Sequence, residues 1–150
     1  MNEKQKKRYK ILLWALIVLT VATIWSLSLR SATASNEQSN AVALPVVEAT
    51  GAKGVTFQEV LITVRKLAHF AEFGWLGFLW GLYGCLQWYP VMWLYGLAVA
   101  VIDECLQFFV PGRAPGIWDV VIDYGGFFCG FALVMAVATY RRRKAQKNNK

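Results

Sequence analysis

The sequence VMWLYGLAVAVIDECLQFFV, residues 91–110, is long and apolar enough to cross a membrane, yet it carries two acids and an amide near its end. About 20 apolar residues in a helix span the hydrocarbon core of a bilayer. An ionised side chain there costs about 2.5–3.5 kcal/mol even on lenient insertion scales, so such residues usually face neighbouring helices or a wet cavity. We therefore take Asp103, Glu104 and Gln107 as candidates for a functional site.

Outward from this segment, three more apolar runs have the length of a membrane span. The chain is 57% hydrophobic over 150 residues, and its charges cluster at the two ends and in short stretches between the runs. This pattern predicts an all-α fold, a single polytopic membrane domain over residues 1–150 with four transmembrane helices in a compact bundle. The predicted spans cover approximately 11–29, 67–86, 91–110 and 117–140, and the predicted outer loop covers 30–59.

Lys and Arg residues set the expected orientation. Most of the 16 basic residues lie in the two tails, 1–10 and 141–150, and the positive-inside rule places such tails in the cytoplasm. We therefore predict a multi-pass protein of the plasma membrane with both termini cytoplasmic. The run 11–29 also fits a cleaved signal peptide, because a basic start precedes it and small residues follow at 32–34. Its length favours a retained anchor, and cleavage would leave the orientation of the other spans unchanged.

The same orientation places every ionisable residue of the later spans in the outer leaflet. His69 and Glu72 follow the outer end of one span, and Asp119 and Asp123 follow the outer end of another. At 100° per residue, Arg65, His69 and Glu72 lie within an arc of about 60°. Asp119 and Asp123 share a helix face as an i,i+4 pair. We therefore expect these polar residues to come together between helices.

Glycines are expected to let these helices pack closely. Gly126 and Gly130 continue the stripe that holds the two aspartates, in a small-x-x-x-small pattern. Gly77, Gly81 and Gly84 form a second small-residue stripe on the preceding span.

The polar residues of the spans and the basic residues beside them form the predicted ligand-binding set. Its cations can pair with carboxylates or meet phosphate groups at the membrane interface. The set is Arg65, Lys66, His69, Glu72, Asp103, Glu104, Gln107, Arg113, Asp119 and Asp123. Should the protein be an enzyme, the candidates for catalysis are His69, Glu72, Asp103 and Asp119.

No cofactor and no metal ion are predicted. The His-x-x-Glu pattern at 69–72 differs from the His-Glu-x-x-His zinc signature, and the three cysteines form no C-x-x-C pair. A carboxylate-rich group with one histidine would favour a hard cation over zinc if it bound one. The net charge of +7 comes mostly from the tails without a nucleic-acid-binding motif, so no nucleic-acid partner is expected.

Three motifs in order resemble signatures of the VanZ-like family of bacterial membrane proteins. They are Arg65-Lys66-x-x-His69-x-x-Glu72-Phe73, Asp103-Glu104-x-x-Gln107-Phe108-x-x-Pro111-Gly112-Arg113 and Asp119-Val120-x-x-Asp123-x-x-Gly126-x-x-x-Gly130. The resemblance extends from Val64 to about Leu133, with Asp123 standing where many members have asparagine. It implies a bacterial cell-envelope protein, related to one that gives low-level resistance to the lipoglycopeptide teicoplanin.

Together, the residues and the resemblance favour a non-enzymatic envelope protein. It is expected to bind a lipid or lipidated ligand at an outer-leaflet polar site and to give low-level tolerance to teicoplanin. The alternative is an intramembrane enzyme that hydrolyses or transfers groups on an envelope lipid, with His69 as general base. A proton- or ion-coupled carrier ranks last, because the acids lie shallow and no internal repeat is found. The expected partners are membrane lipids, with a lipoglycopeptide or an envelope lipid precursor as ligand, and a homo-oligomer remains open.

Overall fold

The computed structural model of the chain describes residues 2–30, 37, 40–45, 47, 56–111, 113 and 116–148. Its principal elements are the α-helices α1 (Glu3–Ser28), α3 (Phe57–Leu86), α4 (Met92–Phe108) and α5 (Ile117–Asn148). No strand occurs among the described residues, so the prediction of an all-α fold is confirmed. Each predicted span coincides with most of one of these helices.

The helix α3 begins earlier than the span predicted at 67–86. A capping box starts it: the backbone N–H of Glu59 donates to the Thr56 side chain, and the Thr56 N–H donates to the Glu59 carboxylate at 2.7 Å. Reciprocal bonds of this kind satisfy N–H groups that the first turn of a helix leaves without partners. Residues 57–59, predicted as the end of the outer loop, are therefore helical, and so are residues 40–45 within the same predicted loop.

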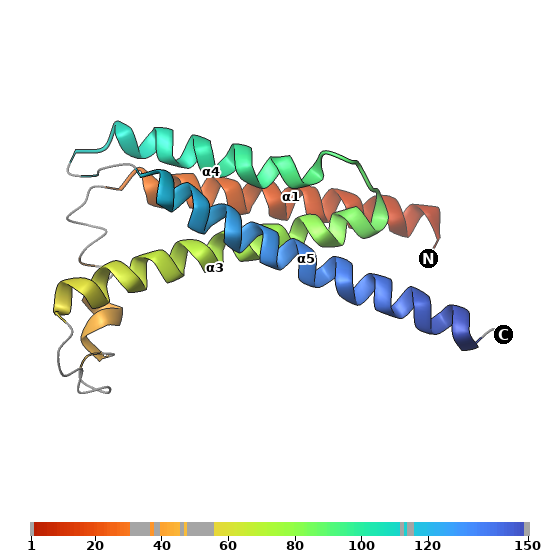
Figure 1. Cartoon of the computed structure of the whole chain (residues 1–150). Coiled ribbons are helices and arrows are strands. Elements are labelled where there is room, and N and C mark those ends of the chain that lie inside the picture. Colours follow the sequence, from red (N-terminus) through yellow and green to blue (C-terminus); the bar gives the residue numbers. More distant parts are fainter. Residues whose placement is uncertain are drawn as a thin grey trace.

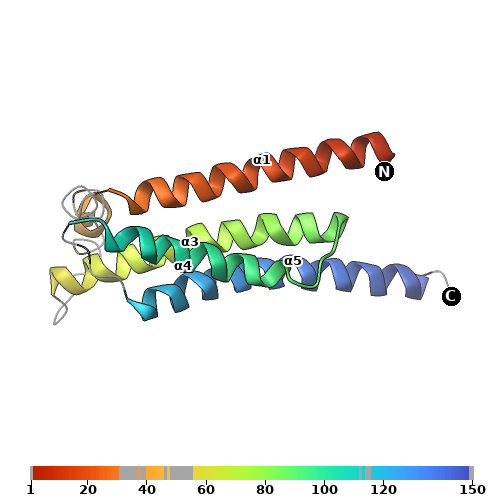
Figure 2. The same ribbon diagram turned by 90° about the horizontal axis from the view of Figure 1, so that it is seen from above.

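Successive helices run in alternating directions along the molecule (Figure 1). As a result α3 and α5 are parallel to each other and cross near the middle, while α1 and α4 run the opposite way. Both termini lie at one end of the molecule, and the start of α3 and the α4–α5 connection lie at the other (Figure 1 and Figure 2). This arrangement brings the polar ends of α3, α4 and α5 together.

The most extensive helix contact joins α3 to α5, and glycines make it possible. A Cβ atom added to Gly77 would lie 1.9 Å from the carbonyl oxygen of Phe127, and one added to Gly126 would lie 2.2 Å from that of Phe70. A Cβ at Gly130 would come equally close to the α3 backbone, at 1.9 Å. No side chain fits at such distances, so the close packing predicted for these positions is confirmed. We call Gly77, Gly126 and Gly130 the glycine seam.

Not every glycine of the predicted stripes belongs to this contact. A Cβ at Gly81 would lie 2.7 Å from Val134 of α5, which extends the close approach toward the termini. Gly84 instead faces Met92 at the start of α4, at an ordinary contact distance of 3.5 Å.

Apolar side chains from all four helices fill the space between them. Phe73 of α3 and Phe127 of α5 are fully buried, and Ile17 and Ile24 bring α1 into the same core. The ring of Phe127 lies directly against Gly96 of α4, where a Cβ would lie 2.2 Å from ring carbons. The aromatic ring thus takes the space of the missing side chain and ties α4 to α5.

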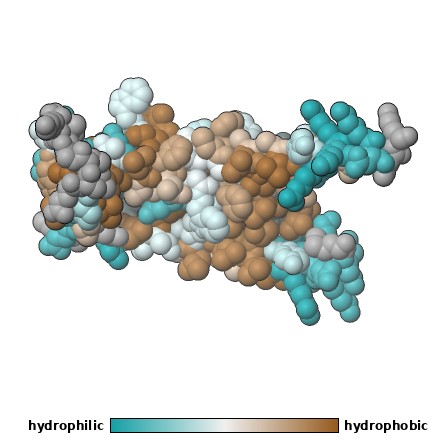
Figure 3. Space-filling view, turned by 90° about the horizontal axis from the view of Figure 1, so that it is seen from below, coloured by the Kyte–Doolittle hydropathy of each residue, from teal (hydrophilic) through white to brown (hydrophobic). Residues whose placement is uncertain are grey.

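On the face shown in Figure 3, hydrophobic residues predominate over the middle of the molecule and hydrophilic residues gather toward its ends. Large hydrophobic side chains are exposed on several helices, among them Leu19, Trp75, Phe128 and Leu133, all more than half exposed. An apolar surface this continuous marks an interaction site or a membrane-embedded region. Among the described helices, α1 and α5 are long and apolar enough to cross a membrane by length and composition.

Candidate functional site

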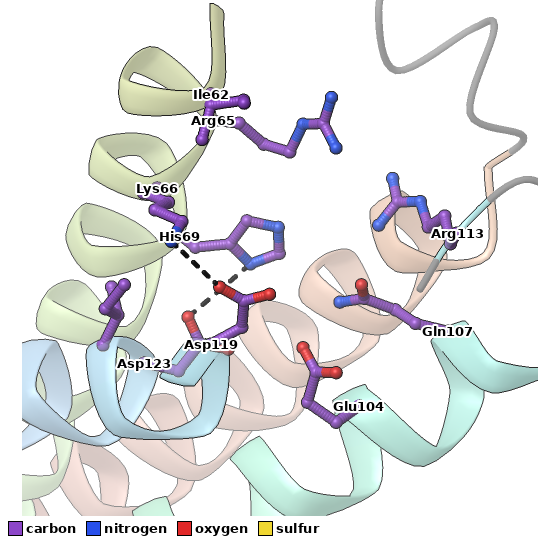
Figure 4. A pocket seen from close by; sticks show the side chains of 10 residues that line it. Ile62, Arg65, Lys66, His69, Glu104, Gln107, Arg113, Asp119 and Asp123 are labelled. Atoms are coloured by element: carbon purple, nitrogen blue, oxygen red, sulfur yellow. Dashed lines mark ion pairs between the residues drawn. The ribbon is translucent and has the colours of Figure 1, made fainter. Parts of the chain in front are cut away.

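A cavity of about 250 Å³ lies between α3, α4 and α5 (Figure 4). Its lining comes from the first half of α3, the end of α4, the α4–α5 connection and the start of α5, at the end of the molecule opposite the termini (Figure 1). Eight of the ten predicted ligand-binding residues line it, together with two isoleucines. The lining residues are Ile62, Arg65, Lys66, His69, Glu104, Gln107, Arg113, Asp119, Ile122 and Asp123. The helix faces expected from sequence spacing therefore do meet around a common space.

Three polar residues from three different helices come close together beside this cavity. His69 of α3, Asp103 of α4 and Asp123 of α5 each place a nitrogen or carboxylate oxygen within 4.8 Å of those of the other two. The Nδ1 atom of His69 lies 3.7 Å from Oδ1 of Asp123. Both aspartates are buried, at 0% and 1% exposure. We call His69, Asp103 and Asp123 the three-helix cluster.

The position of Asp103 is fixed by two hydrogen bonds to one of its carboxylate oxygens. The hydroxyl of Ser28 donates to Oδ2 at 2.8 Å, and the side-chain amide of Gln107 donates to the same atom at 3.0 Å. Ser28 lies at the end of α1 and is itself buried. Sequence reasoning missed Ser28, because a single serine at the end of an apolar run carries no signal of its partner.

Oxygens of this cluster remain without hydrogen-bond partners within the described part of the chain. Neither carboxylate oxygen of Asp123 has one, nor has Oδ1 of Asp103, nor Nδ1 of His69. Buried polar atoms are nearly always satisfied in folded proteins, so each exception needs a physical explanation. The unsatisfied atoms here belong to residues that meet at one place.

A third carboxylate, that of Glu104, follows Asp103 in α4 and lines the cavity. One of its oxygens accepts a hydrogen bond from the backbone N–H of Gly116 at 2.9 Å. This bond ties α4 to the chain just before α5 begins, so it helps to close the end of the cavity. The second oxygen of Glu104 is buried without a partner among the described residues.

Three basic side chains stand at the mouth of the cavity. Arg65 reaches in from α3 and Arg113 from the α4–α5 connection, both above the acidic residues (Figure 4). Burial lowers the pKa of Arg113 from its usual value; the charge of Arg65 lowers it further, while Asp103 and Glu104 raise it. Arginine stays protonated despite such shifts. Two guanidinium groups are therefore held near each other at the mouth of the cavity.

The third basic residue, Lys66, contacts a carboxylate on the facing helix. Its Nζ atom lies 3.7 Å from Oδ1 of Asp119, and both side chains are substantially exposed, at 46% and 39%. Half-exposed ion pairs of this length contribute about 0–1 kcal/mol to stability. The pair therefore contributes little to the stability of the α3–α5 contact, and its main effect is to position two charged side chains at the mouth of the cavity.

Glu72 does not line the cavity, although sequence spacing placed it on one face with Arg65 and His69. It lies with Leu16, Thr20 and Trp75 along a groove between α1 and α3. The reason is that α1 packs against α3 at this depth, so the edge of the polar face that holds Glu72 meets α1 and the edge that holds His69 meets α5. The expectation that Glu72 shares one site with the other residues thus differs from the observed packing.

The comparisons with known proteins agree with the sequence motifs. A family model described as VanZ/LLP1 matches residues 9–138, a range that includes every residue lining the cavity. No curated protein and no solved structure matches the chain. The family match covers most of the sequence and all three motifs that resembled the family. The chain therefore belongs to the VanZ-like family.

Proposed function

We propose that this chain is an envelope protein of the bacterial plasma membrane, with four membrane-spanning helices and both termini in the cytoplasm. The basic tails support this orientation, since they lie together at one end of the molecule (Figure 1). The helix α4 has 17 residues, and at 1.5 Å per residue it is about 25 Å long. That is slightly less than the roughly 30 Å of a hydrocarbon core, which a local thinning of the bilayer can accommodate.

In this orientation the cavity opens at the outer leaflet and binds the anionic head group of an envelope lipid. The observation that carries the proposal is the pair of guanidinium groups at its mouth, Arg65 and Arg113, which come from separate elements and are reinforced by Lys66. Arginine binds phosphate and carboxylate through two parallel hydrogen bonds, and this geometry makes it the preferred residue for such groups. The carboxylates below can accept hydrogen bonds from head-group hydroxyls or amines.

A groove on the outer face of α4 and α5 gives the acyl chain of such a ligand a place to lie. Apolar side chains form most of it, including Val101, Phe108, Ile117 and Val120. The groove adjoins the cavity at Glu104, which lines both. A ligand with an anionic head and one or more acyl chains therefore matches the two spaces together.

Teicoplanin tolerance follows from the same chemistry. Teicoplanin is a lipoglycopeptide, so it combines an acyl chain with polar groups, as envelope lipids and their precursors do. We propose that occupancy of this site by the antibiotic, or by a lipid that the antibiotic needs at the membrane surface, lowers its effect.

Lipid binding by the full chain in a maltoside detergent free of phospholipid tests the proposal. A fluorescent phosphatidylglycerol should bind saturably in the presence of EDTA, and a neutral glycolipid with the same acyl chains should bind much more weakly. Arg113→Gln should weaken phosphatidylglycerol binding by at least about tenfold, because a hydrogen bond to a charged group contributes about 1.5–3 kcal/mol.

The matched control is Arg142→Gln, which removes an equal charge from the exposed cytoplasmic end of α5. Its affinity for phosphatidylglycerol should equal that of the wild type. Equal binding of the two lipids, or equal binding by Arg113→Gln and the wild type, would overturn the head-group assignment.

The position of His69 favours intramembrane lipid hydrolysis as a second candidate function. Its imidazole lines the cavity with Nδ1 3.7 Å from the Asp123 carboxylate, which is longer than a hydrogen bond. Catalytic hydrogen bonds are often long before a substrate binds, and a small shift would let this carboxylate orient His69 as a general base. Lipid turnover by the wild type that is lost in His69→Ala would establish the enzyme. Equal turnover by both proteins would exclude it.

A further inference from the structure

We propose that the three-helix cluster, His69, Asp103 and Asp123, binds a hard divalent cation of the Mg²⁺ or Mn²⁺ class. One ligand atom of each residue lies within 4.8 Å of those of the other two. Bonds of about 2.0–2.6 Å from oxygen ligands to such cations require ligand atoms at roughly this spacing. Small side-chain rotations would bring all three atoms onto one ion.

The hydrogen bonds around the cluster are those expected of metal ligands. Ser28 and Gln107 both donate to Oδ2 of Asp103, which leaves Oδ1 buried and without a hydrogen-bond partner among the described residues. Carboxylates that bind metals are commonly oriented in this way by outer hydrogen bonds. A purely structural aspartate would be expected to use both oxygens.

Asp123 gives the strongest indication of a ligand. Its side chain is buried at 1% exposure, and neither oxygen has a hydrogen-bond partner in the described part of the chain. The His69 Nδ1 atom is too far away, at 3.7 Å, for a hydrogen bond. A buried carboxylate without donors is costly, and a cation shared with Asp103 would remove that cost.

The ligand set determines the class of ion. Two carboxylates and one imidazole carry a charge of about −2 in total, which a divalent cation neutralises, and carboxylate-rich sites favour Mg²⁺, Mn²⁺ or Ca²⁺ over softer metals. Two smaller observations agree: Glu104, which has a buried oxygen, lines the same cavity, and the cavity leaves space for water ligands.

This inference deepens the proposed function, because it rests on the same cavity. The cation would occupy the floor while Arg65 and Arg113 stand at the mouth, so a phosphate group in the cavity would meet positive charge from both directions. Mg²⁺ is often bound in this manner, by a few carboxylates together with a substrate phosphate.

Mn²⁺ alone is the probe, measured by electron paramagnetic resonance on the full chain, purified in maltoside detergent with a tag that lacks histidine. One Mn²⁺ per chain should bind saturably, and excess Mg²⁺ should displace it. The chain has a single histidine, so coupling of bound Mn²⁺ to an imidazole nitrogen would identify His69 without mutagenesis. Absence of saturable binding, or binding without nitrogen coupling, would overturn the site.

Two variants and a control complete the test. Asp123→Asn should weaken Mn²⁺ binding by at least about tenfold, a loss at the lower end of what outer-sphere changes alone produce. His69→Gln should abolish the nitrogen coupling. This second variant keeps the proposal testable if Asp123→Asn fails to fold. The control is Glu59→Gln, which removes a carboxylate from α3, the helix that holds His69. It keeps the capping box, because glutamine also serves at that position. The Mn²⁺ affinity of Glu59→Gln should match that of the wild type. A wild-type Mn²⁺ affinity in Asp123→Asn would contradict the proposal.

The two proposals fail separately. Mn²⁺ binding is measured without phospholipid, and lipid binding is measured in EDTA. Metal binding together with no lipid binding, either in EDTA or in excess Mg²⁺, would leave the cation site standing and overturn the head-group assignment. Lipid binding in EDTA together with no metal binding would overturn the cation site and leave the head-group assignment standing.

Discussion

At the scale of single residues, the site is held by contacts that cross the bundle. Asp103 belongs to α4, yet its carboxylate is oriented by Ser28 of α1 and by Gln107 one turn away on its own helix. A small polar residue that no motif contains thus controls the direction of a motif residue. Mutation of such a residue can change the stability of the site without removing any group that would contact a ligand.

Ser28→Ala should lower the free energy of unfolding by about 1–3 kcal/mol, because it removes a donor to a buried carboxylate. Unfolding in mixed micelles, followed by circular dichroism, measures the effect. Ser26→Ala is the matched control: Ser26 is exposed and bonds only to the Thr23 carbonyl of its own helix, so its change should stay within about 0.5 kcal/mol. Equal losses in the two variants would show that the Ser28–Asp103 bond contributes nothing measurable.

Asp119→Asn should leave the stability nearly unchanged and abolish teicoplanin tolerance. The carboxylate is 39% exposed and pairs with a half-exposed lysine, so its loss should cost less than about 1 kcal/mol. Its place on the cavity wall, however, puts it beside any bound ligand. Susceptibility to teicoplanin and to vancomycin, compared in a deletion strain complemented with each variant, provides the measurement. A large fall in folded protein would indicate instead that Asp119 serves to hold the helices together.

At the scale of helices, the glycine seam determines how the site is assembled. Gly126 lies one turn below Asp123 on α5 and meets the backbone of Phe70, the residue next to His69 on α3. The seam therefore brings the two helices to backbone contact directly beside the site. Any residue larger than glycine would push His69 and Asp123 apart.

Gly126→Ala should destabilise the protein by about 1–3 kcal/mol or more, since its Cβ would lie 2.2 Å from the Phe70 carbonyl oxygen. Gly125→Ala is the control on the adjacent residue, where a Cβ would meet its nearest atom only at 3.9 Å. Alanine is favoured over glycine in helices by about 1 kcal/mol, so Gly125→Ala should be neutral or stabilising. Thermal unfolding in detergent distinguishes the two, and similar midpoints would argue against the seam.

Hydropathy and spacing in the sequence are sufficient to predict the helices and most of the cavity lining. Apolar runs locate the helices, and i,i+4 spacing groups the polar residues of each one. The early start of α3 was readable as well, since Thr56-Phe57-Gln58-Glu59 has the pattern of a capping box. The spacing of residues along the sequence does not show which neighbouring helix each edge of a polar face will contact. For that reason the sequence pattern placed Glu72 in the cavity, whereas it lies between α1 and α3. The sequence predicts that His69, Asp103 and Asp123 belong to one site, but it does not predict that their ligand atoms lie within 4.8 Å of one another, because the three residues are on three helices at unrelated spacings.

At the scale of the whole molecule, charge and polarity are distributed along one axis. The basic tails occupy one end, the cavity lies at the other, and exposed apolar side chains cover the region between them (Figure 1 and Figure 3). With the proposed four spans, such a protein has two possible orientations in a membrane, and the positive-inside rule predicts the one with the basic tails in the cytoplasm.

Reporter fusions test that orientation. A fluorescent protein fused after residue 150 should fold and fluoresce in the cytoplasm, whereas alkaline phosphatase inserted between α4 and α5 should be active outside. Moving the phosphatase to the C-terminus is the control, and it should be inactive there. Phosphatase activity at the C-terminus and none between α4 and α5 would reverse the topology and place the cavity on the cytoplasmic side.

The backbone contact between α3 and α5 also determines which helix of the bundle can be displaced most easily. Since these two helices form the most extensive contact and approach to backbone distance at the glycine seam, we expect His69 and Asp123 to keep their relative position. The helix α4 is joined to these two helices less extensively, and it carries Asp103, Glu104 and Gln107. Should the proposed amphiphile enter the cavity, we expect α4 to be displaced while α3 and α5 keep their places, because α4 has the less extensive contacts. The size of ligand that the cavity accepts would then depend on how easily α4 is displaced. Substitutions at Gly96 or Phe127, where α4 packs against α5, would change that size without changing any group that lines the cavity.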